Sequence, residues 1–68
     1  MEREVLERFG MRVRERRLEL GLSQEGLALA CGLDRSYVGG IERGQRNASL
    51  LNVEKIARAL GTNVRDLF

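Results

Sequence analysis

The chain has 68 residues with a formal net charge of +2 at pH 7, and 43% of its residues are hydrophobic. We expect one domain spanning residues 1–68, because the chain is too short for two. A chain of this length buries only about 60% of its unfolded surface, so its stability is marginal. We also expect a cytoplasmic protein without a membrane span or signal peptide, since the N-terminal segment MEREVLERFG is charged and Cys31 has no disulfide partner.

Apolar residues recur at helical spacing along the chain, and no segment shows the alternating pattern of a strand. Five helices are therefore expected, in chain order, over residues 3–20, 24–31, 35–43, 50–60 and 64–68. Glycines follow four of them, at Gly21, Gly32, Gly44 and Gly61. Capping residues precede four of them, at Ser23, Asp34, Ser49 and Asn63. The sequence thus predicts an all-α fold.

Each predicted helix has an apolar face that would point into one small core. The inward-facing residues are expected to be Leu6, Phe9, Val13, Leu27, Cys31, Val38, Ile41, Leu50, Val53, Ile56, Ala57 and Leu60. Cys31 is included because a free cysteine most often behaves as a small apolar residue. With no histidine and a single cysteine, we expect no metal site, and neither a cofactor nor a small-molecule ligand is indicated.

The second and third predicted helices are joined by the tight turn CGLD, as in a helix-turn-helix motif. Such a motif needs a small residue where the two helices cross, and Ala28 stands there. It also needs a residue that tolerates positive φ in the turn, and Gly32 meets this requirement. Apolar residues stand on both sides of the crossing, Leu27 and Val38 among them. Because these requirements coincide in one register, the segment indicates a DNA-binding module.

Eleven of the twelve basic residues are arginine, whose planar guanidinium suits phosphates and guanine edges. Arg35 and Ser36 would project from the first turn of the third helix, which a recognition helix presents to base edges. Tyr37 follows them, and it could contact a phosphate or a thymine methyl group, or instead be a half-buried part of the core. The pattern predicts base contacts from Arg35, Ser36 and Tyr37.

Gly39 and Gly40 stand side by side within the third helix, where each glycine costs roughly 1 kcal/mol relative to alanine. They follow Arg35 and Ser36 by one turn, so we expect them on the same outward face, where the backbone could approach DNA closely. Neutral substitutions on an exposed face are the alternative. If the backbone does approach DNA, specificity would depend partly on DNA bending and groove shape.

Residues 22–68 resemble the phage repressor and Cro-type (XRE) helix-turn-helix family of DNA-binding regulators. The similarity rests on SQ at 23–24, LA at 27–28, GL at 32–33, IERG at 41–44 and IARALG at 56–61. Within that family, LDRSYVGGIERGQRN is most similar to the small controller proteins of restriction–modification systems. The resemblance implies a five-helix, lambda-repressor-like domain that binds palindromic operators upstream of its own gene as a homodimer.

Polar residues flank the predicted recognition helix and suit contacts with phosphates. The expected phosphate-binding set is Ser23, Gln24, Gly39, Arg43, Gln45 and Asn47. The resemblance implies that Gln24 anchors to a phosphate and that Arg46 reaches a base. It also implies that Arg17 and Glu42 form a partly buried ion pair that orients the third helix. A solvated glutamine and an ordinary polar loop are the alternatives.

The chain ends on apolar residues that admit two interpretations. Val64, Leu67 and Phe68 could fold back onto the core of their own chain, or they could join Leu51 in a two-fold dimer interface. The resemblance implies dimerisation through this region, and a small core gains stability by burying more surface. We therefore expect a homodimer whose two subunits contact each other through these four residues.

The sequence favours a transcriptional regulator that binds double-stranded DNA sequence-specifically. The alternative is a protein-interaction module, such as an antitoxin or an adaptor, that keeps the same helices. The polar rim formed by Gln24, Arg35, Arg43 and Arg46 favours DNA, because a protein-binding module has little need of it. An enzyme is not expected, since no nucleophile with a partner base and no phosphate-binding loop can be identified.

Overall fold

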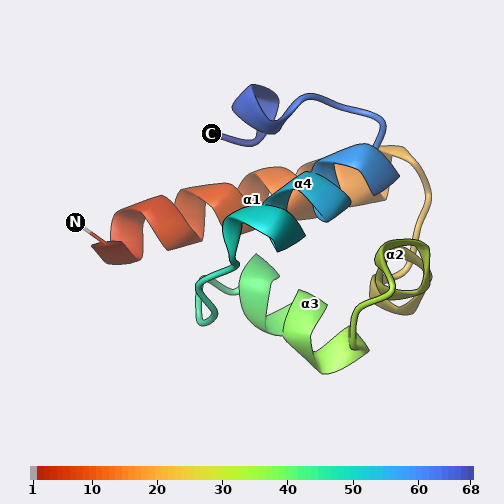
Figure 1. The fold of residues 1–68 in the computed structure, drawn as a ribbon, viewed down its shortest axis with the longest axis horizontal. Helices are drawn as coiled ribbons and strands as arrows, with labels where there is room; N and C mark the ends of the chain where they lie inside the picture. Colours follow the sequence, from red (N-terminus) through yellow and green to blue (C-terminus); the bar gives the residue numbers. More distant parts are fainter. Residues whose placement is uncertain (1) are drawn as a thin grey trace.

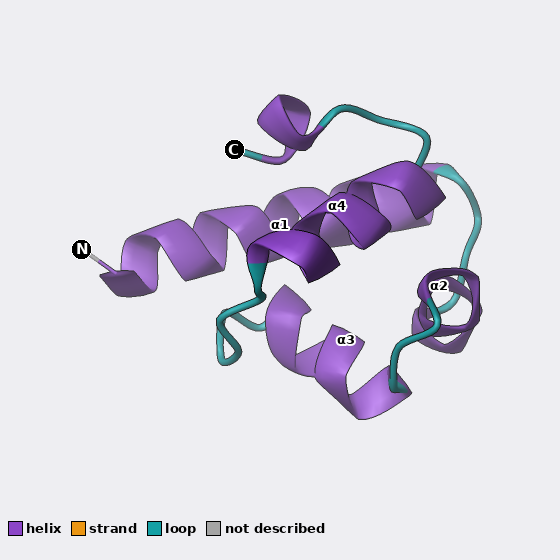
Figure 2. Cartoon of the chain, in the orientation of Figure 1, coloured by secondary structure: helices purple, strands orange, loops and turns teal. Residues whose placement is uncertain are grey.

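The computed structural model describes residues 2–68, which form helices and loops without a strand (Figure 2). The four α-helices are α1 (Glu2–Glu19), α2 (Gln24–Cys31), α3 (Arg35–Glu42) and α4 (Leu50–Ala59). A 3-10 helix, η1 (Val64–Leu67), follows them. None of the described helices combines the length and the apolar character needed to cross a membrane. The all-α class is confirmed, and each α-helix begins and ends within one residue of its predicted bounds.

The fifth expected helix, over residues 64–68, is a 3-10 helix and not an α-helix, so a count of five α-helices is not confirmed. The segment η1 is a 3-10 turn of four residues, in which Asp66 N donates to Asn63 O at 3.0 Å. Gly61, at a φ of +64°, ends α4 only a few residues earlier. A tight 3-10 turn is what brings Leu67 back to the core over so short a distance.

The local signals at most helix ends act as expected. Ser23 Oγ accepts a hydrogen bond from Gly26 N at 2.9 Å, and Ser49 Oγ accepts one from Asn52 N at 3.2 Å. Four glycines have the positive φ that stops a helix at little energetic cost: Gly21, Gly32, Gly44 and Gly61. Because these signals involve only neighbouring residues, the helix bounds can be predicted from the sequence.

Two of the predicted caps do not act as caps. Asp34 and Asn63 occupy N-cap positions, but neither side chain makes a capping hydrogen bond. The Asp34 carboxylate instead accepts a hydrogen bond from Ser36 Oγ at 2.7 Å. At the start of α3, a contact between two side chains has therefore replaced the expected contact with the backbone.

The helices surround one apolar core. Helix α3 packs against α1 and α2, and η1 packs against α1 and α4. In Figure 1, α2 and α3 lie below the long helix α1, and the C-terminal turn lies above it. The buried core residues are Phe9, Val13, Leu27, Ala28, Cys31, Val38, Ile41, Val53, Ile56, Ala57, Leu60 and Leu67. This core holds α2 and α3 on one side of the molecule and the C-terminal turn on the other.

Leu6 and Leu50 depart from the expected inner face. Leu50 lies 83% exposed at the first position of α4, and Leu6 is only half-buried. Leu50 has the correct spacing to share the face of Val53, but α4 extends past the core at that end. Helical spacing predicts which face a residue is on, and it does not predict where along the helix the core stops.

Helices α1 and α3 approach each other closely at Gly10. A Cβ atom at this position would collide with the carbonyl oxygen of Ile41 and would lie 2.7 Å from that of Glu42. Real Cβ atoms essentially never come this close to a backbone atom. Gly10 therefore permits close approach between two helices of the chain, a contact that the sequence analysis did not predict.

Candidate nucleic-acid interface

The helix-turn-helix motif is formed by α2, the turn that follows it, and α3. Ala28 is buried at the crossing, and Gly32 adopts a φ of +70° in the turn. Leu33 N donates to Ala28 O at 2.9 Å, which closes the turn against α2. The small residue and the turn glycine therefore act as the sequence predicts.

The first turn of α3 points into solvent, as expected of a recognition helix. Arg35 and Ser36 are both exposed. The Ser36 hydroxyl donates to Asp34, so its oxygen keeps the capacity to accept another hydrogen bond. The guanidinium of Arg35 makes no side-chain hydrogen bond or ion pair within residues 2–68 and is free to meet a base edge.

A shallow groove at the start of α2 brings several predicted residues together. It is lined by Arg17, Ser23, Gln24, Glu25 and Arg35. Helix α2 begins here, so its first free amide groups make the site favourable for an anion. The groove thus joins the expected phosphate contact of Gln24 to the expected base contact of Arg35.

The side-chain amide of Gln24 is held in place by a hydrogen bond to Glu42. Gln24 Nε2 donates to Glu42 Oε1 at 3.1 Å, and the side chain is half-buried. An amide nitrogen carries two hydrogens, so one remains to donate to a phosphate. Sequence reasoning missed this contact, because the two residues are 18 positions apart and lie on different helices.

Arg17 and Glu42 form the expected ion pair, and both side chains are buried. Arg17 Nε and Nη2 donate to the two carboxylate oxygens at 2.6 and 3.0 Å, in bidentate geometry. Arg17 Nη1 also donates to Leu22 O at 2.8 Å. The hydrogen bonds to Glu42 raise the pKa of Arg17, so the guanidinium remains protonated. Helices α1, α2 and α3 are thereby tied together beneath the interface.

The loop after α3 presents a set of exposed polar side chains. Arg43 Nε donates to Gln45 Oε1 at 3.0 Å, which draws these two side chains together. Arg46 and Asn47 are exposed beside them. The guanidinium carbon of Arg46 lies 5.9 Å from the ring centroid of Tyr37, close enough for a cation–π contact.

Tyr37 is half-buried, and its hydroxyl is already in contact with another helix. Asn52 Nδ2, on α4, donates to the Tyr37 hydroxyl oxygen at 3.1 Å. The ring also packs against the core. A base contact from Tyr37 remains a prediction. Asn52 gave no sequence signal, because its partner is 15 residues away and its neighbours are apolar.

Gly39 and Gly40 are buried, and the expectation that they present open backbone is wrong in this respect. A Cβ on Gly39 would lie 3.1 Å from Arg43 Nη1 and 3.5 Å from Gln24 Oε1. A Cβ on Gly40 would lie 2.6 Å from Arg46 Cγ. The side chains of Arg43 and Gln24 therefore cover Gly39, and the side chain of Arg46 covers Gly40.

The four residues predicted to form the dimer interface differ in their exposure to solvent. Leu51 is 63% exposed, Phe68 is partly exposed and stacks on Phe9, and Val64 is half-buried. Leu67 is only 1% exposed and fills the core of its own chain, so it has no surface to offer a partner. Leu51 and Val64 line an apolar groove together with Leu50 and Glu54, and Phe68 is not among its lining residues.

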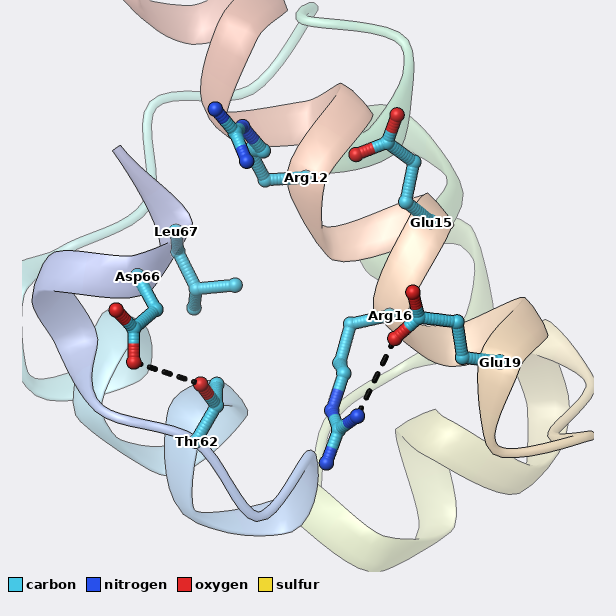
Figure 3. Close-up of a pocket in the computed structure, with 7 residues that line it drawn as sticks. All are labelled: Arg12, Glu15, Arg16, Glu19, Thr62, Asp66 and Leu67. Atoms are coloured by element: carbon cyan, nitrogen blue, oxygen red, sulfur yellow. Dashed lines mark hydrogen bonds and ion pairs between the residues drawn. The ribbon is translucent and has the colours of Figure 1, made fainter.

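Figure 3 shows a third groove, between α1 and the C-terminal segment, lined by Arg12, Glu15, Arg16, Glu19, Thr62, Asp66 and Leu67. Arg16 Nη1 donates to Glu19 Oε1 at 3.2 Å, and Thr62 Oγ1 donates to Asp66 Oδ2 at 3.2 Å. Arg16 Nε also donates to Leu60 O at 3.0 Å. These polar groups largely satisfy one another, and the groove contains none of the predicted DNA-contacting residues.

Comparison with known sequences identifies the class of this fold. The helix-turn-helix family profile matches residues 13–67, which includes α2, α3 and α4. The chain therefore belongs to the helix-turn-helix family, of the phage repressor and Cro type. This agrees with the exposed first turn of α3 and with the buried pair beneath it.

Within that family, the chain is similar to controller proteins. Control protein C.BamHI from Bacillus amyloliquefaciens is 53% identical over 60 residues, which cover 87% of this chain and 74% of that protein. The crystal structure of the restriction–modification controller protein C.AhdI from Aeromonas hydrophila has 62% identity and a TM-score of 0.90, covering 93% and 96% of the two chains. The C.Esp1396I tetramer, solved in complex with its natural 35-base-pair operator, has 37% identity and a TM-score of 0.81, covering 87% and 78%.

Proposed function

We propose that this chain is a sequence-specific DNA-binding transcriptional regulator, a restriction–modification controller protein that binds operators upstream of its own gene in the cytoplasm. The observation that carries the proposal is the exposed pair Arg35 and Ser36 on the first turn of α3, beside a groove at the start of α2. The similarity to C.AhdI and the operator complex of C.Esp1396I support it.

In the proposed complex, α3 enters the major groove of the duplex. Arg35 would donate two hydrogen bonds to O6 and N7 of a guanine, and Ser36 would contact a neighbouring base. Gln24 would donate its free amide hydrogen to a phosphate at the start of α2. Arg43, Gln45 and Asn47 would contact phosphates on the far side of α3. Phosphate contacts on both sides of α3 would fix its register.

A homodimer would bind two half-sites in a palindromic operator. The apolar groove that contains Leu50, Leu51 and Val64 lies on α4 and η1, away from the first turn of α3. A second copy seated there would leave both recognition helices free. Two-fold symmetry would then place the half-sites about one helical turn, or ~34 Å, apart.

A protein-interaction module is the competing function, and the exposed polar rim counts against it. Arg35, Arg43 and Arg46 are all exposed and are not paired with a carboxylate within residues 2–68. Three unpaired guanidinium groups around one helix suit a polyanion better than an apolar protein surface. Catalysis is not part of the proposal, because the family to which the chain belongs consists of regulators.

The proposal is tested by selecting bound sites from random duplexes and measuring their affinity by fluorescence anisotropy. We expect a palindromic site to be enriched, and the affinity to fall steeply as salt is raised. Arg35→Ala should lose about 1–3 kcal/mol of preference for that site over a scrambled duplex.

Arg12→Ala is the matched control, because it removes the same charge from an exposed site on α1 beside the groove of Figure 3. It should keep the site preference. If no sequence is enriched, or if the two variants lose the same preference, the proposed function is wrong.

A further inference from the structure

We propose that Gly40 is a positioning residue for Arg46: because it has no side chain, Arg46 can fold back onto α3 and lie over Tyr37. This inference rests on the proposed function and on the base contact that the resemblance implies for Arg46. It assigns to a helical glycine a role in setting the direction of an arginine that comes from the following loop.

The contact between Gly40 and Arg46 is close along the length of the arginine side chain. A Cβ built on Gly40 would lie 2.6 Å from Arg46 Cγ, 3.7 Å from its Cβ and 3.6 Å from its Nε. The first of these distances is shorter than real Cβ atoms tolerate. Any residue other than glycine at position 40 would therefore force the Arg46 side chain to shift from its place against α3.

Two contacts hold Arg46 in this place. Its stem packs on Gly40, and its guanidinium carbon lies 5.9 Å from the ring centroid of Tyr37. The ring cannot easily turn away, because Tyr37 packs against the core and Asn52 donates to its hydroxyl at 3.1 Å. The position of an exposed arginine in the loop is thus determined by residues of α3 and α4.

The consequence for DNA binding is preorganisation. An unrestrained arginine loses rotamer freedom when it contacts DNA, whereas an arginine already held against α3 loses less. Gly40 also leaves α3 thin at the point where Arg46 crosses it. Glycine at position 40 makes the isolated helix less stable than alanine would. Its proposed benefit is that it orders a side chain that contacts DNA.

The test compares the melting temperature of Gly40→Ala with that of Gly39→Ala, its neighbour in the same helix. Gly39→Ala is not the control for DNA affinity, because Gly39 and the side chains beside it belong to the predicted phosphate-binding set. Both changes remove a helical glycine, so both should raise the melting temperature or leave it unchanged. A Cβ at Gly39 meets only the far ends of the Arg43 and Gln24 side chains and does not touch Arg46. Gly40→Ala should weaken binding to the selected duplex about two- to tenfold.

A double mutant separates positioning from a direct clash between the new methyl group and DNA. In an Arg46→Ala background, Gly40→Ala should cause no further loss of affinity. An equal loss in both backgrounds would mean that the methyl group itself meets the DNA, and it would overturn the inference.

A measurement without DNA keeps this inference separate from the proposed function. In the free protein, nuclear Overhauser contacts between Arg46 and the single tyrosine ring should be present, persist in Gly39→Ala and vanish in Gly40→Ala. If they persist in Gly40→Ala, the positioning role is refuted. If the wild type shows these contacts but binds no duplex, the proposed function fails while the positioning of Arg46 stands.

Discussion

At the scale of single residues, three helical glycines have two different roles. Gly10 faces the backbone of another helix, and carbonyl oxygens there cannot move aside without shifting α3. Gly39 and Gly40 face arginine and glutamine side chains, which can rotate away. The helix sequence does not distinguish these roles, because both place glycine where its helix propensity is poor.

This difference predicts opposite effects of the same substitution. Gly10→Ala should destabilise the fold by about 1–3 kcal/mol, because the added methyl group overpacks the contact between α1 and α3. Gly39→Ala should be neutral or stabilising by up to about 1 kcal/mol. Urea unfolding followed by circular dichroism measures both changes. An unaltered midpoint for Gly10→Ala would show that the two helices can separate freely.

At the scale of helices, α3 is oriented by polar contacts as well as by the core. Glu42, at its C-terminal end, accepts from Arg17 on α1 and from Gln24 on α2. One carboxylate therefore sets the angle of α3 and the direction of a predicted phosphate ligand together. Changes at Glu42 should affect stability and DNA binding jointly, although the side chain is buried.

The buried pair of Arg17 and Glu42 should contribute far more to stability than the surface pair of Arg16 and Glu19 on α1. Glu42→Gln leaves the buried guanidinium of Arg17 without a countercharge and should lower the free energy of unfolding by about 3–5 kcal/mol. Glu19→Gln removes the partner of Arg16 in an exposed pair and should change it by about 0–1 kcal/mol. Thermal unfolding of the two variants measures the contrast, and equal effects would contradict the orienting role of Glu42.

At the scale of the whole molecule, the two proposed surfaces use different elements. The residues predicted to contact DNA belong to α2, α3 and the loops beside them, whereas the apolar groove belongs to α4 and η1. Figure 1 shows α3 and the C-terminal turn on opposite sides of α1. One chain could therefore hold a second copy and a duplex at once.

A charge in the apolar groove should separate the proposed dimer without unfolding the chain. Leu51 is 63% exposed, so Leu51→Asp places its carboxylate in solvent in the free chain and beside Glu54 of the groove. Sedimentation should shift from the mass of a dimer to that of a monomer. Leu29→Asp, at a residue of α2 that is 78% exposed, makes the same change outside the groove and should leave the mass unaltered. A dimer that persists in Leu51→Asp would place the interface elsewhere.

The sequence by itself determined the helix bounds, the crossing of α2 and α3, and the exposed position of Arg35 and Ser36. These features depend on contacts between near neighbours, such as the cap at Ser23 and the turn glycine Gly32. Helical spacing then predicted most of the core, because a periodic pattern defines a face without knowledge of its partner.

Only the tertiary structure decided what each face meets. It buried Leu67 within its own chain, left Leu50 in solvent, joined Gln24 to Glu42, and assigned the close backbone approach to Gly10. Each of these outcomes depends on residues far apart in the chain that come into contact only when the helices pack. Local sequence patterns do not indicate which distant residues will form such contacts, so these contacts can be identified only in the folded molecule.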